Sequence, residues 1–517
     1  VFGDKSQGSS GMRLQTFCEE SYEFHTLIDP IATFCYQPVP EQPVIKIVPG
    51  QPERFLAVAP TICEIGTPFN VRIKGEDSWG NPSDQCNQTF FTQCGVKIEG
   101  LPDSITFKPG NFSEIITGLK FSSEETFAID FLDKSKKVIF STNPIQCVQN
   151  PKHRYFWADL HGQSEETIGT GSAEQYFKFA RDLAFIDAVA HQGNDFQISS
   201  EFWTALDAVC EKFDGDKKFV TIPGYEWSGN TSLGGDRNVF FPQKGRTIRR
   251  SSHALIIDKS DVETDCDTAK DLFEAFSKNK EFDVVCYAHC GGRYADIEYA
   301  HDARFEKSVE VHSSWGTFEW LLEDAFRLGY RVGIVANSDG HKGRPGASYP
   351  GAGLFGAIGG LTCFLAKELD RGSIFECMRK RKHYATTGGP SGRPLLSLKM
   401  EFSEKANVFH DDPRFHNDQG HNSKVAAMGD IVHLHSGSAK LKFSITTNSP
   451  IERVDIFNGI NHLETIRPYT SDDLGSRIRV LWSGAEYRGR SRQVVWNGKA
   501  MVTDNKILDA QPINFFN

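Results

Sequence analysis

Hydrophobic and polar positions follow three rhythms along the chain, and each rhythm predicts a different kind of domain. Residues 1–53 are irregular and rich in Gly, Ser and Pro, which indicates an extended N-terminal arm. Residues 54–150 carry short alternating runs ended by turns such as Gly80-Asn81-Pro82, as in an immunoglobulin-like β-sandwich. Residues 151–394 alternate apolar strands with helical segments. From 395 to 517 short alternating runs return and predict a C-terminal β-rich domain.

The central segment reads as an α/β domain. Apolar residues recur at i, i+3 and i+4 in its helical stretches, as at Phe318, Leu321, Leu322 and Ala325. Strands separated by helices imply parallel βαβ units. We therefore expect a distorted (β/α)7 barrel built from seven strands, at 154–160, 185–190, 218–226, 283–289, 308–314, 330–339 and 359–366.

Six of these predicted strands end in side chains that bind metals. In a parallel barrel the carboxyl ends of the strands converge on one site, and imidazole and carboxylate are the ligands of Zn²⁺, Mn²⁺ and Fe²⁺. A single strand-end His is more often structural, but a buried cluster without a metal would leave many polar groups without partners. The predicted metal ligands are His161, His191, Glu226, His289, Glu310, His312, Asp339 and His341.

Each ligand type has an expected role. The histidines supply neutral nitrogens, and Glu226 can bridge two metals through its two oxygens. Glu310 and His312 alternate along one strand, so one should enter the site and the other should face away. Metals that share a water would lower its pKa enough to give hydroxide near neutral pH. With neutral His as most ligands, we expect a net positive site that attracts an anionic or strongly polar substrate.

Polar residues near the strand ends are candidates for binding such a substrate. Arg237 and Asn238 follow the third strand, and Arg293 follows His289 through two glycines. A guanidinium suits a phosphate, sulfate or carboxylate oxygen; for Arg293 a surface salt bridge is the alternative. We count Asn194 in the same group, and His161, Glu226, His289, Asp339 and Arg237 as the catalytic set.

The strand-end motifs resemble those of the PHP (polymerase and histidinol phosphatase) superfamily. Its members open with an HxH strand end and close with an S/N-D-x-H strand end, as Ser338-Asp339-Gly340-His341 does. A largely uncharacterised, mainly bacterial PHP-like family is most similar, through DLHGQSEETIGTG (159–171), AHQGNDFQ (190–197), GYEWSGNTSLGGDRNVFF (224–241), GTFEWLLEDA (316–325) and HYATTGG (383–389). The resemblance implies metal-dependent hydrolysis, usually of phosphoesters.

One position departs from the superfamily. The second His of the first motif is Gln163 here, and Gln is a poor ligand for these metals. We therefore expect fewer than the usual three ions of Mn, Zn or Fe, with Gln163 next to the ligands or touching substrate.

Charge and cysteine content narrow the setting. The net charge of −10 comes with no basic run, which argues against nucleic-acid binding, and no apolar run approaches the ~20 residues of a membrane span. Six of twelve cysteines precede residue 150 without C-x-x-C spacing, which favours disulfides. The expected pairs are Cys86–Cys94, Cys63–Cys147 and Cys18–Cys35.

Three sequons, at Asn87, Asn111 and Asn230, agree with the cysteines in predicting a secreted or lumenal (periplasmic) glycoprotein. A start at Val1 fits a processed chain. The leading hypothesis is a secreted metallohydrolase acting on a small anionic ester. The alternatives are a non-enzymatic extracellular binding or structural protein that retains the metal site, and a metal-dependent lyase or C–N hydrolase.

Overall fold

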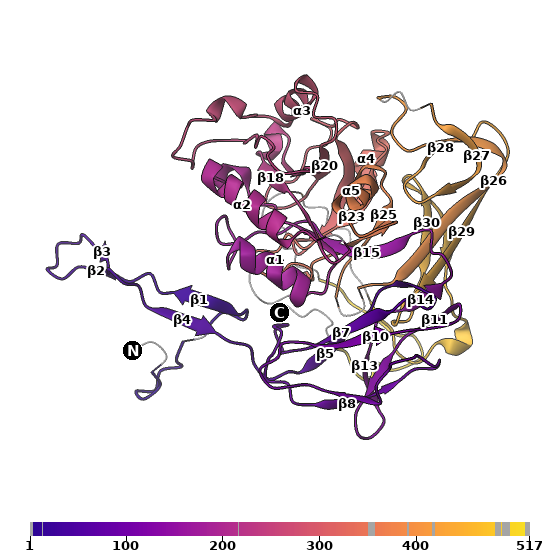
Figure 1. Ribbon diagram of the computed structural model, residues 1–517, viewed down its shortest axis with the longest axis horizontal. Helices are drawn as coiled ribbons and strands as arrows, with labels where there is room; N and C mark the ends of the chain where they lie inside the picture. The colour runs from indigo at the N-terminus through magenta and orange to yellow at the C-terminus, as the bar shows by residue number, and fades with distance from the viewer. Residues whose placement is uncertain are drawn as a thin grey trace.

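The computed structural model describes residues 4–12, 14–215, 217–349, 357–389, 392–415, 419–480, 488 and 497–511. Within these residues an N-terminal arm, an N-terminal β domain, a central domain with helices, and a C-terminal β region follow one another along the chain (Figure 1). Among the described helices, none combines the length and the apolar sequence that a membrane crossing requires.

The arm is a ribbon that projects from the body of the molecule (Figure 1). Strand β1 (Glu19–Glu23) pairs antiparallel with β4 (Val44–Ile47), and β2 (Leu27–Ile28) pairs with β3 (Gln37–Pro38) nearer the tip. Cys18 lies at the base, where its N–H donates to Asn81, whereas Cys35 lies exposed near the tip. The ribbon therefore separates the two cysteines that we expected to pair.

The N-terminal β domain has three small sheets instead of the two that a sandwich predicts. The sheets are β10-β7-β5, β11-β14-β6 and β13-β12-β8-β9, and β14 runs parallel to β6. Buried side chains such as Val71, Phe107 and Phe131 form their shared core. The strands are β5 (Arg54–Val58), β6 (Ile62–Glu64), β7 (Phe69–Glu76), β8 (Thr89–Gln93), β9 (Ser104–Thr106), β10 (Glu114–Leu119), β11 (Glu125–Phe127), β12 (Asp130–Leu132), β13 (Val138–Ser141) and β14 (Ile145–Val148).

The central domain contains two mixed sheets, so the predicted (β/α)7 barrel is wrong. The first sheet has the order β17-β16-β15-β24-β25, and the second has the order β18-β19-β20-β21-β22, with β23 also paired to β21. The strands are β15 (Arg154–Asp159), β16 (Ala188–Ala190), β17 (Val220–Ile222), β18 (Gly224–Ser228), β19 (Asp236–Phe240), β20 (Val285–Ala288), β21 (Glu306–Ser313), β22 (Gly316–Thr317), β23 (Gly333–Ala336), β24 (Leu361–Ala366) and β25 (His383–Thr386).

Two features explain why the barrel does not close. Pro223, which has no N–H to donate, splits the predicted third strand into β17 and β18. The chain then turns back after β18, so that β19 pairs antiparallel with it. In addition, β24 runs antiparallel to β15 rather than completing a parallel ring. A barrel needs parallel neighbours throughout, and both features break that pattern.

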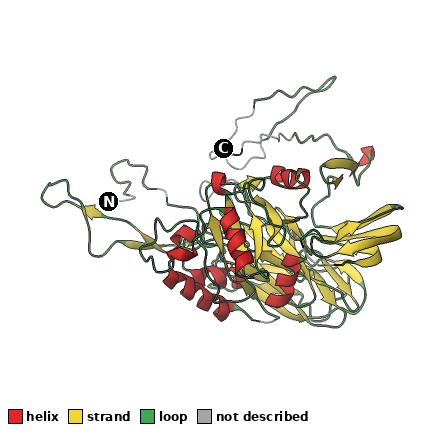
Figure 2. Cartoon of the chain, turned by 90° about the horizontal axis from the view of Figure 1, so that it is seen from above, coloured by secondary structure: helices red, strands yellow, loops and turns green. Residues whose placement is uncertain are grey.

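Five α-helices in the described residues pack on these sheets (Figure 2). They are α1 (Ala173–Asp182), α2 (Ser200–Phe213), α3 (Ala269–Lys278), α4 (Glu319–Arg327) and α5 (Arg371–Arg379). Helices α1 and α3 begin with complete capping boxes, Ser172 with Gln175 and Thr268 with Asp271. Short 3-10 turns lie at Asp195–Gln197, Thr231–Leu233, Val262–Thr264 and Ser471–Asp473.

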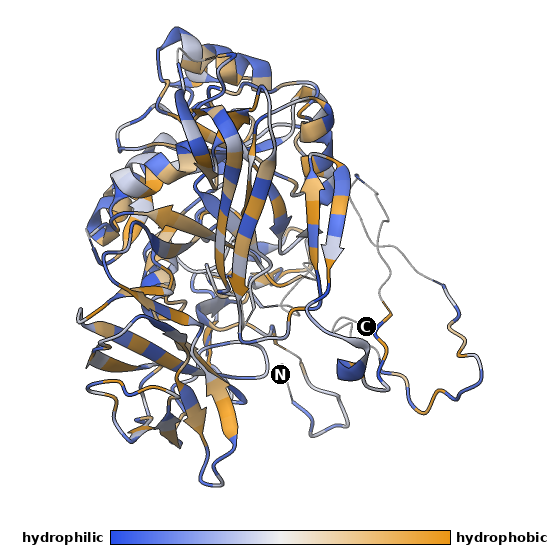
Figure 3. Ribbon diagram, turned by 90° about the vertical axis from the view of Figure 1, so that its right-hand side faces the viewer, coloured by the Kyte–Doolittle hydropathy of each residue, from blue (hydrophilic) through white to orange (hydrophobic). Residues whose placement is uncertain are grey.

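The C-terminal region is built around one long strand, β26 (Leu395–Phe409). It pairs with β27 (His421–Ala427), β28 (Ile431–His433) and β29 (Ala439–Thr446), and β30 (Val454–Asn458) forms a hairpin with β31 (Asn461–Ile466). Hydrophobic and hydrophilic residues alternate along the long strands (Figure 3). The expected β-rich pattern does not continue over 474–480, where no strand forms, and residues 481–487 lie outside the described part of the chain.

All twelve cysteines, each within the described residues, are free thiols, so none of the three expected disulfides is formed. The thiols of Cys86 and Cys94 face different carbonyls, those of Ser83 and Ala128. Cys63 and Cys147 lie opposite one another on β6 and β14 without a bond.

Candidate metal centre

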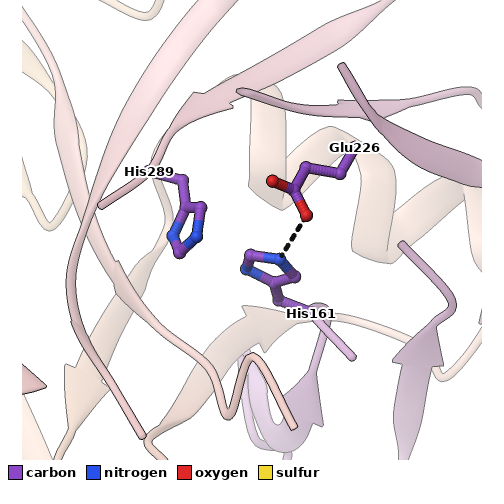
Figure 4. A group of neighbouring side chains, drawn as sticks. All are labelled: His161, Glu226 and His289. Atoms are coloured by element: carbon purple, nitrogen blue, oxygen red, sulfur yellow. Dashed lines mark ion pairs between the residues drawn. The ribbon is translucent and has the colours of Figure 1, made fainter. Parts of the chain in front are cut away.

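Three side chains from different strands of the central domain converge at the heart of the candidate site. His161 follows β15, Glu226 lies in β18 and His289 follows β20; one potential ligand atom of each lies within 4.8 Å of the other two (Figure 4). His161 Nε2 is 3.5 Å from Glu226 Oε2, and all three side chains are buried. The first residue comes from one sheet and the other two from the second, so the site lies where the two sheets meet.

Two further buried carboxylates complete the cluster. Asp339 lies between the imidazoles, with Oδ1 3.3 Å from His161 Nε2 and Oδ2 3.2 Å from His289 Nε2. Glu310 lies behind them, with Oε1 3.1 Å from His161 Nδ1 and 3.0 Å from His289 Nδ1. Asp339 and Glu226 thus face the Nε2 atoms, and Glu310 faces the Nδ1 atoms.

The loops that carry His161 and Asp339 hold each other in place. The Ser338 N–H donates to Asp159, the Leu160 N–H donates to Asn337, and the Asp339 N–H donates to the carbonyl of His161. Asp339 adopts a left-handed backbone conformation, with φ of 47°. The position of its carboxylate is therefore fixed by the fold and not by the local chain alone.

The nitrogens that face this centre lack hydrogen-bond partners. His161 Nε2 and His289 Nε2 are buried, and the carboxylate oxygens beside them lie outside hydrogen-bonding geometry. A buried polar atom without a partner costs about 1–3 kcal/mol. A metal ion ligated by these nitrogens and by Glu226 and Asp339 would satisfy them, so the residues present fit a divalent metal.

The buried carboxylates of the cluster stabilise positive charge on their neighbours. Burial opposes the charged form of His161, but the carboxylates of Asp339 and Glu310 outweigh it and raise the His161 pKa well above its ordinary range. Burial and His161 oppose the charging of His289, yet the same carboxylates raise its pKa to about 9. Although burial opposes ionisation of Glu310, the two imidazoles lower its pKa to about 2. Without a metal, protons on the imidazoles would balance the carboxylates; metal and protons therefore compete.

Some predicted ligands lie elsewhere. The His191 Nε2 accepts from the Ser164 N–H at 3.1 Å and lies 2.7 Å from the Ser164 hydroxyl, and His191 is outside the His161–Glu226–His289 group. His312 faces away from Glu310 and contacts Thr317 and the carbonyl of Ile358. His341 lies at the edge, with Nε2 3.3 Å from Asp339 Oδ1.

Arg237, predicted as a catalytic and substrate-binding residue, is wholly buried in a structural role. Its guanidinium binds Glu306 at 2.9 Å and donates to the backbone carbonyls of residues Gly234, Gly235, Asp296 and Ala300. All three of its nitrogens are used, so we correct this assignment.

The predicted substrate-binding amides form a network beside the centre. Gln163 donates to Asn194 at 3.1 Å, and Asn194 donates to Glu226 at 3.1 Å and to Ser228 at 2.8 Å. The Asn238 amide nitrogen lies 3.0 Å from His161 Nδ1. Gln163 is therefore next to the ligand set and 3.4 Å from His341 Nε2.

Arg293 lies at the edge of the site and binds Asp236, a residue that the sequence did not single out. Its Nε donates to Asp236 at 2.7 Å, and its Nη2 is 4.0 Å from Glu226. Burial and the charge of Glu226 raise the pKa of Asp236 to about 7. Strand alternation could have found Asp236, because it shares a face with Asn238 while Arg237 points the other way.

The three sequon asparagines, Asn87, Asn111 and Asn230, are exposed, as glycosylation would require. Glycosylation and secretion stay predictions.

No family model matches the chain, and no solved structure matches it. Three chlamydial proteins are similar, each named only as an uncharacterized protein. That of Chlamydia pneumoniae is 22% identical over 412 residues, covering 73% of this chain and 63% of its own. Those of Chlamydia muridarum and Chlamydia trachomatis serovar D are 21% and 20% identical over 423 residues, 74% of this chain. The chain thus spans less than two thirds of the length of these relatives.

Proposed function

We propose that this chain is a metal-dependent hydrolase of phosphoesters or related anionic esters. One observation carries the proposal: two buried imidazole nitrogens without hydrogen-bond partners, His161 Nε2 and His289 Nε2, face the carboxylates of Glu226 and Asp339. The strand-end motifs that resemble the PHP superfamily add support. A divalent metal held there supplies a Lewis acid that polarises an ester and activates water.

The residues divide into ligands and positioning groups. His161 and His289 would ligate through Nε2, with Glu226 and Asp339 supplying oxygens, a set suited to zinc, manganese or iron. Glu310 would hold the Nδ1 proton of His161 and so keep its Nε2 lone pair directed at the metal, as carboxylates commonly do behind metal-binding histidines. Its Oε1 also lies 3.0 Å from His289 Nδ1, outside hydrogen-bonding geometry. The amide network of Gln163 and Asn194 stands beside this set, which favours fewer than three ions.

The first test is metal content followed by hydrolysis. The purified chain, loaded separately with zinc, manganese or iron, is analysed for bound metal and assayed on chromogenic phosphate, sulfate and carboxyl esters. We expect bound metal and turnover of at least one anionic ester, both abolished in His161→Ala and Asp339→Ala. Full metal content and activity in His161→Ala would contradict the proposal.

A matched pair on one strand separates the site from its surroundings. Glu310→Gln should weaken metal binding by about 10- to 100-fold, the cost of losing a carboxylate behind ligating histidines. His312→Gln, also buried in β21 but facing away, should leave it unchanged. Metal bound without turnover of any ester would favour the non-enzymatic alternative, and turnover of amides alone would favour a C–N hydrolase.

A further inference from the structure

The metal centre by itself does not supply the net positive charge that we expected to attract an anion. Glu226, Glu310 and Asp339 are all buried around it, so one divalent ion with neutral histidines leaves an excess negative charge. Arg237 forms an ion pair with Glu306, and Arg293 forms an ion pair with Asp236, so neither charge is available to a substrate. An anionic substrate needs a cation from elsewhere.

Arg344, three residues after His341, has the required unused donors. Its side chain is buried, with only 6% of the residue exposed. Nη1 donates to the carbonyl of Trp79 at 3.0 Å and to the Asn81 side chain at 3.2 Å, both in the loop after β7 of the N-terminal β domain. Nε and Nη2 are buried without a hydrogen-bond partner. A buried guanidinium with two unsatisfied nitrogens is costly, which points to a ligand.

Arg344 lies in the same hollow as His341, the residue at the edge of the candidate metal centre. A small hollow of about 10 Å³ next to His341 is lined by Arg344 together with Ser314, Lys342, Ser348 and Tyr349. That volume is close to what one water molecule needs, so one oxygen atom of a substrate group would fit. Hydroxyl and cationic side chains predominate in the lining, as an oxyanion requires.

The surroundings carry an excess of positive charge. Arg54 and Lys342 lie near Arg344 as like charges, Glu76 and Asp77 lie near it as opposite charges, and Lys74 shares Glu76 with Arg54. Glu76 is already bound by Lys74 at 2.8 Å and by Arg54 Nε at 2.7 Å, and Asp77 accepts from the Trp79 and Asn81 N–H groups. Arg344 itself forms no ion pair with a carboxylate of the described residues; its hydrogen bonds go to the neutral groups of Trp79 and Asn81.

We propose that Arg344 binds an oxyanion group of the substrate (phosphate, sulfate or carboxylate) beside His341, and that the loop carrying Trp79 and Asn81 positions its guanidinium. The N-terminal β domain then forms part of the substrate site. The inference deepens the proposed function and rests on it for the reaction that follows binding.

Direct binding to the metal-loaded full chain tests this subsite. Inorganic phosphate, sulfate and acetate are titrated by calorimetry, and the order of their affinities identifies the group. Arg344→Met should weaken binding of the preferred anion by about tenfold or more, the loss expected for hydrogen bonds to a charged group. Arg327→Met, on the surface of α4 with 55% of its side chain exposed, is the matched control and should bind as the native chain does. Metal content should stay equal in all variants.

If Arg344→Met does not fold, Arg344→Lys carries the test. Lysine keeps the charge but cannot donate to Trp79 and to an anion through one planar fork, so we expect a similar loss. Native affinity in either folded variant would overturn the subsite. Hydrolysis is measured in parallel: anion binding that depends on Arg344 without turnover would overturn only the proposed function, and turnover unaffected by Arg344→Met would overturn only the subsite.

Discussion

Gly291 lets the backbone approach closely to the proposed metal ligands His289 and Asp339. A Cβ at this position would collide with His289 Nε2 and lie 3.3 Å from Asp339 Oδ2, whereas a Cβ at the neighbouring Gly292 would meet no atom within 4 Å. The two glycines are adjacent in sequence yet differ completely in what surrounds them.

Gly291→Ala should therefore lower metal content sharply, because its methyl group occupies the space in front of the ligand nitrogen. Gly292→Ala is the control and should keep the native content. Both are measured by elemental analysis after dialysis against limiting metal. Native metal content in Gly291→Ala would mean that the metal does not bind at His289 Nε2.

Gln163 stands where the PHP superfamily, which the motifs resemble, has a second His, and it is the basis for expecting fewer than three ions. Gln163→His should raise the number of bound ions or change the preferred metal, because an imidazole would then replace the amide whose nitrogen lies 3.4 Å from His341 Nε2. Gln163→Asn is a control that keeps the amide. Equal stoichiometry and equal metal preference in Gln163→His would show that this position does not limit metal binding.

At the scale of elements, His383 joins the two central sheets. It begins β25 in the first sheet, while its Nδ1 donates to the carbonyl of Ile334 in β23 and its Nε2 accepts from Ser308 in β21, both in the second sheet. Burial lowers the His383 pKa from 6.5 to about 3. The two hydrogen bonds that His383 makes to the second sheet depend on a neutral imidazole.

Stability should consequently fall in mild acid. Below about pH 6.5 the unfolded chain takes up a proton on His383 and the folded chain does not. The free energy of unfolding therefore keeps its whole contribution from His383 only above that pH. It declines toward pH 3 by about 1.4 kcal/mol per pH unit from this residue. The test is urea denaturation near pH 7 and near pH 5, which gives the loss of unfolding free energy between the two pH values. That loss should be smaller by about 2 kcal/mol in His383→Gln than in the native chain. His435→Gln, at an exposed position, should keep the native difference; an identical pH dependence in His383→Gln would contradict the argument.

At the scale of the whole molecule, the N-terminal β domain is anchored to the central domain through polar contacts. The Trp157 Nε1–H in β15 donates to the Thr61 hydroxyl at 2.8 Å, and Arg72 donates to the carbonyl of Arg181 at the end of α1. Thr61 and Trp157 are almost completely buried. Arg344 adds a third contact, through its hydrogen bonds to Trp79 and Asn81.

Thr61→Val should lower the free energy of unfolding by about 1–3 kcal/mol, because it leaves the Trp157 N–H buried without an acceptor while preserving volume. Thr67→Val, at an exposed position of the same domain, should stay within about 0.5 kcal/mol of the native chain. Calorimetry or chemical denaturation measures both. Equal stability of the two variants would indicate that the domain junction carries little energy.

The sequence by itself indicated which residue types gather at the candidate site, because residue type and strand alternation are local. The rule that alternate residues face opposite sides separates Glu310 from His312, and the same rule applied to β19 separates Asp236 from Arg237. Strand and helix positions in the central domain also followed from local periodicity, as at β20 and α4.

Only the tertiary structure decided how these elements pair and which polar side chains are already satisfied. Strand direction depends on long-range hydrogen bonds, so the antiparallel β24 and the break at Pro223 replaced the expected barrel with two mixed sheets. The role of an arginine depends on partners distant in sequence: Glu306 and backbone carbonyls use every nitrogen of Arg237, whereas Arg344 reaches a loop more than 260 residues away and keeps two nitrogens without a partner. Local sequence cannot report such partners, because contact and burial are set by the packing of the whole chain.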